Sequence, residues 1–187
     1  MVKSNKYIEG LIEDLSSESR RLRQNAALEL NYCCVDSASI VLPESQALID
    51  ALDVPETRTR WAVLEALSKL VAQDASLCEP ALASVENALF DETSGPLHLS
   101  SMRFLCNAGR QNPQTSDLVW PLIDEAIQCF HGDQEFPDML TLLVDFSMGN
   151  LSDETKKGFS ERMMFDAQNN RGSVQRKAQL IVDNLSK

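Results

Sequence analysis

Apolar residues recur along the chain at intervals of three and four, in short blocks separated by turn residues. This spacing gathers the apolar side chains on one helix face and is typical of amphipathic α-helices. The first blocks predict helices at residues 5–15, from about residue 18 onward, at 43–53 and at 56–73. Six later blocks predict six more helices, and they contain Leu82, Leu97, Ile123, Leu143, Phe159 and Ile181.

The helices come in pairs that repeat at an interval close to 37 residues. ETRTRWAVLEALSKL (56–70) matches ESRRLRQNAALEL (18–30) when Arg60 is laid on Arg23, and at the same shift LIDAL (48–52) falls on LIEDL (11–15). Near the end, LLVD (142–145) returns as LIVD (180–183). We therefore predict one repeat domain over residues 1–187, with units at 4–39, 40–76, 77–112, 113–150 and 151–187.

One pair of short helices cannot bury its apolar face alone, so such units must stack side by side to form a continuous core. Two helices per unit and a period of this length are typical of an α-solenoid. The sequence thus predicts an all-α solenoid of about five two-helix repeats, or about ten helices.

Within this class the chain resembles HEAT repeats, which are armadillo-like. The second helix of that family typically reads V-R-x-x-A-A-x-A-L-G-x-I, and TRWAVLEALSKL (59–70) and LRQNAALELNYC (22–33) follow it. LHLSSMRFLCNA (97–108) keeps the apolar pattern but has His98 where Arg is usual. The resemblance implies a right-handed superhelix whose second helices line a concave face that holds another macromolecule.

The variable positions of the HEAT pattern mark a candidate partner-binding strip on that face. They fall on Gln24, Leu28, Tyr32, Trp61, Glu65, Lys69, Leu99, Arg103 and Asn107. Trp61 and Tyr32 are amphipathic aromatic side chains, which make good anchors for a peptide or helix. The alternative is that both rings pack sideways against neighbouring helices, and position alone leaves both options open.

The charge balance limits the choice of partner. Asp and Glu number 28 against 17 Lys plus Arg, for a net charge of −11. Such a chain repels phosphate backbones, which disfavours nucleic acid. No Lys or Arg occurs between Arg110 and Lys156. The acids there are interpreted either as solvated helix faces or as a surface that prefers a partner with basic groups.

Candidate chemistry is sparse. The sequence has neither GxxxxGK[ST] nor GxGxxG, and the two histidines, His98 and His131, lack a neighbour at metal-ligand spacing. We therefore predict no catalytic residue, no metal and no cofactor. In the HEAT family an Arg at the places of Arg23 and Arg60 pairs with acids at an adjacent turn, which implies a structural role for both.

Five cysteines form an odd number without CxxC spacing, which favours a reducing cytosol over a disulfide framework. Cys106 and Cys129 fall at apolar-periodic positions, and we expect both to be core residues. No long apolar segment indicates secretion or membrane insertion, so we expect a cytoplasmic protein with no membrane partner.

These observations favour a non-catalytic protein–protein interaction module, such as a scaffold, adaptor or assembly factor, that binds a protein or peptide on its concave face. The alternative is an enzyme on the same scaffold, since some HEAT-like proteins remove alkylated bases from DNA and others attach tetrapyrrole chromophores. A third option is a structural unit that associates with itself. The sequence leaves the oligomeric state open.

Overall fold

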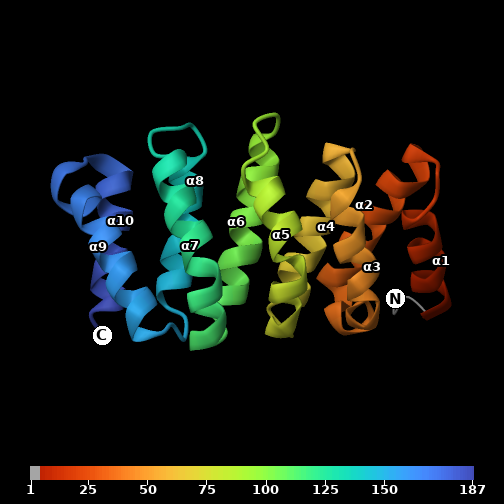
Figure 1. The fold of residues 1–187 in the computed structure, drawn as a ribbon, viewed down its shortest axis with the longest axis horizontal. Helices are drawn as coiled ribbons and strands as arrows, with labels where there is room; N and C mark the ends of the chain where they lie inside the picture. The colour runs from red at the N-terminus through yellow and green to blue at the C-terminus, as the bar shows by residue number, and fades with distance from the viewer. Residues whose placement is uncertain (1–4) are drawn as a thin grey trace. The chain divides into compact units, whose positions relative to one another are not determined.

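The computed structural model describes residues 5–187, and in this range it contains α-helices and short 3₁₀ turns but no strand. Figure 1 shows the order of the helices along the chain. The ten α-helices are α1 (Asn5–Leu15), α2 (Arg20–Ser37), α3 (Ser45–Asp50), α4 (Thr57–Leu70), α5 (Cys78–Leu89), α6 (Gly95–Gly109), α7 (Pro113–Cys129), α8 (Phe136–Ser147), α9 (Asp153–Asn169) and α10 (Gly172–Leu185). The predicted number and type of elements are confirmed for the described residues.

The segment 43–53, which was expected to be one helix, is broken into three pieces. The 3₁₀ turns Leu42–Glu44 and Ala51–Asp53 flank the short helix α3. Pro43 lies at the start of the first turn, where its missing N–H costs nothing. Val54 is extended, as expected for a residue before proline, and this ends the segment. The predicted start of the first repeat, Ser4, lies outside the described residues.

Contacts between helices divide the chain into two compact units, and the boundary falls inside α6. The described part of unit 1 is residues 5–104 and unit 2 is Leu105–Lys187. In unit 1, α2 packs against α1 and α4, and α3 packs against α4 and α5 (Figure 1). The buried side chains of this unit are mostly aliphatic, and the largest include Leu30, Leu48, Leu64, Leu67, Leu89, Met102 and Phe104.

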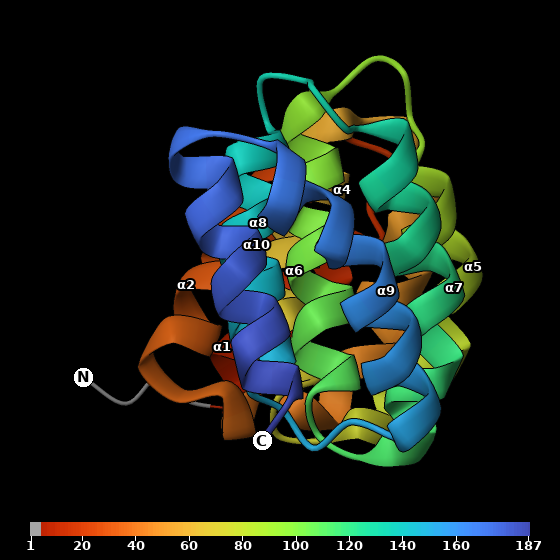
Figure 2. The same ribbon diagram turned by 90° about the vertical axis from the view of Figure 1, so that its left-hand side faces the viewer.

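In unit 2, α10 packs against α8 and α9, and α7 packs against α9. The end view in Figure 2 shows α7 and α9 on one side of this unit and α8 and α10 on the other. The core is aromatic where these helices meet: the rings of Phe146 and Phe159 are 5.5 Å apart, and Trp120 lies 5.2 Å from Phe159.

Gly109 allows a close helix approach inside unit 2. A Cβ atom at this position would lie 2.6 Å from Cγ2 of Val119 and 2.8 Å from Cε2 of Phe146, well inside normal contact distance. A methyl group there would force one of two well-packed neighbours to move. The absence of a side chain at Gly109 therefore sets how closely its helix meets α7 and α8.

Two helices of unit 2 begin with local capping sequences. The Asn112 side chain accepts a hydrogen bond from the Thr115 amide at 2.8 Å, and the Ser152 hydroxyl accepts one from the Thr155 amide at 2.9 Å. Asn and Ser are strongly preferred at this position, because their oxygens satisfy amides that have no partner in the first turn. The sequence alone thus defines where α7 and α9 begin.

Four of the five cysteines are buried, and within residues 5–187 none of them forms a disulfide. The expectation for Cys106 is confirmed, but the expectation for Cys129 is wrong, because Cys129 is exposed. Cys129 is the last residue of α7, where the chain leaves the helix for the exposed turn that follows. Burial raises the pKa of the Cys34 thiol and that of the Cys78 thiol to about 12.

Candidate functional site

Side-chain hydrogen bonds connect corresponding places in successive repeats. Lys69 bonds Asn31 over a sequence separation of 38 residues, Ser100 bonds Glu65 over 35, and Asn184 bonds Ser147 over 37. Separations close to one repeat length are expected when like helices lie side by side in a stack. These bonds indicate repeats stacked in register within each unit.

Arg23, at the start of α2, joins the first repeat to the second. Its Nε and Nη2 donate to the Glu56 carboxylate, and its Nη1 donates to the carbonyl oxygens of Ser17 at 2.7 Å and Glu18 at 3.0 Å. The side chains of Arg23 and Glu56 are only 16% and 8% exposed. The hydrogen bond from Arg23 lowers the pKa of Glu56. The pairing with an acid at an adjacent turn, which the HEAT resemblance implied, is present.

Arg60 makes the corresponding contact one repeat later. Its Nη1 donates to Oδ2 of Asp91, in the turn before α6, at 2.7 Å. The hydroxyl and amide of Thr93 also bond this carboxylate, and with Arg60 they lower the pKa of Asp91 to about 2. His98 replaces the arginine in the third repeat, and its Nε2 lies 2.7 Å from the Asp91 carbonyl oxygen.

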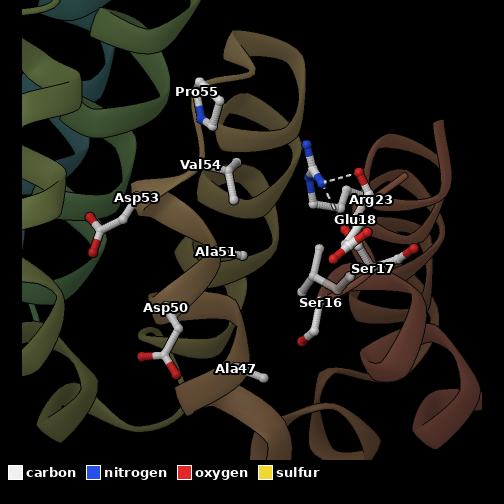
Figure 3. A pocket seen from close by; sticks show the side chains of 11 residues that line it. Ser16, Ser17, Glu18, Arg23, Ala47, Asp50, Ala51, Asp53, Val54 and Pro55 are labelled. Carbon is white, nitrogen blue, oxygen red and sulfur yellow. Dashed lines mark hydrogen bonds between the residues drawn. The ribbon is translucent and has the colours of Figure 1, made fainter. Parts of the chain in front are cut away.

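A hollow of about 510 Å³ lies beside Arg23, between the turn Ser16–Glu18 and the segment 47–55 (Figure 3). Figure 3 shows that Asp50 and Asp53 point away from Arg23, whereas Ala47, Ala51 and Val54 face it. Since Arg23 already donates to three residues, its guanidinium is engaged in holding the turn. The geometry supports the structural role that the HEAT resemblance implied for Arg23.

The nine residues of the predicted strip are all at least partly accessible, and we call them the second-helix strip. Eight lie on α2, α4 and α6 within unit 1, and Asn107 lies on the part of α6 that belongs to unit 2. Tyr32 is 58% exposed, Arg103 is exposed, and the other seven are half-buried. Tyr32 is therefore available to a partner, and Trp61 is partly available.

Glu65 is the centre of a polar network on this strip. Its Oε1 accepts from the Ser100 hydroxyl at 2.9 Å and lies 3.3 Å from Nε of Arg103. Lys69, one turn further along α4, donates to Oδ1 of Asn31 at 2.8 Å and to the Glu65 carbonyl at 2.6 Å. Burial lowers the pKa of Lys69, and the Glu65 carboxylate opposes that shift. Neighbouring repeats thus hold these side chains in place before any partner arrives.

The strip positions recur in unit 2, where sequence reasoning did not follow them. Counting back from the helix ends, Asp145 on α8 and Asp183 on α10 take the place that Asn107 takes on α6, and both are exposed. Thr141 and Gln179 precede them by one turn. The match between LLVD and LIVD contained this information, because it places the two aspartates at one repeat position.

Two further pairs in unit 2 escaped prediction. His131 Nε2 lies 2.9 Å from Oδ1 of the buried Asp166, and Arg162 donates two hydrogen bonds to Asp124. Among the described residues no group of three acids, cysteines or histidines could hold a metal ion. Nor, in residues 5–187, does any helix combine the length and apolar character that crossing a bilayer requires.

The ten helices and their bonds at one-repeat spacing define an all-α solenoid of the armadillo type. Structural comparison agrees. Computationally designed armadillo repeat proteins for modular peptide recognition superpose with a TM-score of 0.78 at 15% identity, over 96% of this chain and 82% of theirs. A designed armadillo repeat protein in complex with the peptide (KR)4 superposes with a TM-score of 0.75 at 14% identity, over 98% of this chain and 87% of its own.

An engineered protein gives a TM-score of 0.77 at 14% identity, over 97% of this chain and 80% of its own. No protein-family model matches the sequence, and no curated protein does. At such identities these likenesses concern the fold alone, and they confirm the armadillo-like architecture that the HEAT resemblance implied.

Proposed function

We propose that this chain is a non-catalytic interaction module whose second-helix strip holds a segment of a partner protein. One observation carries the proposal: all nine strip residues are partly accessible, whereas Ala26, Leu30, Ala62 and Leu67 on the same helices are buried. Two aromatic side chains and a network that is already ordered give the strip anchors and fixed polar groups. We include a cytosolic location in the proposal, which five cysteines without a disulfide among the described residues support.

The test is affinity purification from the native cell with the unmodified chain and with the double variant Tyr32→Ala/Trp61→Ala. We expect the variant to lose a partner that the unmodified chain retains, at a nearly unchanged melting temperature. Val35→Ala is the matched control, because Val35 is 66% exposed on the same helix but lies outside the strip. A large fall in melting temperature, or a partner retained by the double variant, would contradict the proposal.

We further propose that the partner segment carries basic groups. The exposed Asp145 and Asp183 support this, because unlike charges at a binding surface favour encounter and register. A designed armadillo repeat protein has also been solved in complex with a basic peptide, (KR)4. That peptide is the probe, and fluorescence anisotropy is the measurement.

Asp145→Asn/Asp183→Asn should weaken binding of (KR)4, and Glu86→Gln/Glu92→Gln is the control that removes two exposed charges elsewhere. An equal loss of affinity for (KR)4 in the two double variants would mean that the peptide responds only to net charge. That result would contradict the proposal of a basic partner.

A further inference from the structure

Two neighbouring hollows lie between α7 and α9 in unit 2, and we call them together the α7–α9 groove. One has a volume of about 380 Å³ and the other about 440 Å³, and Arg162 and Phe165 line both. The remaining lining residues are Ile127, Gln128, His131 and Asp166 in the first, and Trp120, Asp124, Gly158 and Glu161 in the second. The groove is built on the first helices of two repeats, so it is separate from the second-helix strip.

Phe165 is the aromatic centre of the groove and is exposed. At 67% it is more exposed than any other large hydrophobic side chain in residues 5–187. Trp120 provides a second ring that the fold holds in place, since it packs on Phe159. A Cβ at Gly158 would lie 2.8 Å from Trp120 Nε1, so the missing side chain leaves room for this indole. Exposed and preordered aromatic rings are the usual anchors of an interface.

Of the acidic side chains described in the groove, one has no charged partner and is available to a ligand. Arg162 Nε donates to Asp124 Oδ1 at 2.5 Å and its Nη2 to Oδ2 at 2.9 Å, so these two charges compensate each other. Asp166 is paired with His131. Glu161 is exposed, and its carboxylate makes no hydrogen bond or ion pair within residues 5–187. No Lys or Arg occurs on α7, and Lys157, one turn before Glu161, forms no ion pair with it in the described part of the chain.

We propose that the α7–α9 groove is a docking site for a peptide segment in which an Arg or Lys side chain stands next to an apolar one. The cation lies between the Glu161 carboxylate and the ring of Phe165, which attracts cations through its electron-rich face. The apolar neighbour enters the hollow beside Ile127. Charge complementarity selects this occupant. Among the described residues that line the groove, the Glu161 carboxylate is the charge that no neighbour compensates, and an acidic segment would be repelled by it.

The test uses three synthetic peptides: four repeats of Arg-Leu-Gly, of Glu-Leu-Gly and of Arg-Ser-Gly. Affinity is measured by fluorescence anisotropy, and the site is mapped by amide chemical shifts in NMR. We expect the Arg-Leu-Gly peptide to bind most tightly and to shift amides of α7 and α9. Phe165→Ala should weaken binding about fivefold and Glu161→Gln about threefold. Both residues are exposed, so circular dichroism and melting temperature should not change.

Met148→Ala and Glu125→Gln are the matched controls, because both residues are exposed and neither lines the groove. The proposal is overturned if Phe165→Ala has no more effect than Met148→Ala, if either comparison peptide binds as tightly, or if millimolar Arg-Leu-Gly peptide shifts no amide of α7 or α9. It is also overturned if the free protein forms a dimer that Phe165→Ala dissociates, because the groove then holds a second copy. Asp145→Asn/Asp183→Asn should leave this binding intact, which separates it from the proposed binding of (KR)4 at Asp145 and Asp183.

Discussion

The contact between Arg23 and Glu56 offers a quantitative test of how successive repeats are joined. Replacing Arg23 with Ala removes the ion pair and the two hydrogen bonds to the carbonyls of Ser17 and Glu18. Hydrogen bonds that involve a charged group contribute about 1.5–3 kcal/mol each, and removal of one partner leaves a largely buried carboxylate unpaired. We therefore expect Arg23→Ala to lower the free energy of unfolding by about 3 kcal/mol.

Glu56→Ala should cost less, about 1–2 kcal/mol, because Arg23 keeps its two carbonyl partners. The double variant should be little worse than Arg23→Ala, so the two changes should fall short of additivity by about 1–2 kcal/mol. Urea unfolding followed by circular dichroism measures the four free energies, and a constant slope against urea shows that the transitions can be compared.

The pair Arg162–Asp124 is the matched comparison. It also has two hydrogen bonds, but its side chains are 37% and 26% exposed. Water screens such a pair, so its coupling should be below about 1 kcal/mol. Additive effects at Arg23 and Glu56, within about 0.5 kcal/mol, would show that this pair does not join the repeats and would refute the reasoning.

Three further predictions concern packing, acid stability and thiol reactivity. Gly109→Ala should lower the melting temperature, because the overpacking costs about 1–3 kcal/mol and exceeds the gain in helix propensity of about 1 kcal/mol. Gly10 has open space around it, so Gly10→Ala should raise the melting temperature. Asp91 has a pKa of about 2 when folded and about 3.9 when unfolded, so it stabilises the fold above pH ~4 and loses this effect as the pH falls towards 2. Urea unfolding of Asp91→Asn over that range should show a weaker dependence on pH than the unmodified chain. Iodoacetamide at mildly alkaline pH should modify Cys129 first, because Cys129 is exposed, whereas Cys34 is a buried thiol with a raised pKa. Mass spectrometry locates the modified residue, and rapid modification of Cys34 in the native protein would contradict this prediction.

The sequence by itself determined the class of fold. Apolar spacing of three and four is a local property, and it marked ten helices without reference to any contact between them. Two helical segments also begin at local signals, because Pro43 and Asn112 act on the backbone beside them. Repetition then implied stacking, since a single hairpin leaves its apolar face uncovered. The place of Arg23 and Arg60 at one repeat position likewise pointed to a recurring structural contact.

Tertiary structure decided which residues share a surface. Glu65, Asp124 and Asp166 each have a partner on another helix, 35 to 38 residues away, and this pairing depends on how each helix is rotated against its neighbour. Periodicity does not define that rotation closely enough, which is why Cys129 was placed in the core and the α7–α9 groove was not foreseen. Local spacing shows which face of a helix is apolar, but only the packed neighbours determine how much of that face stays open to water.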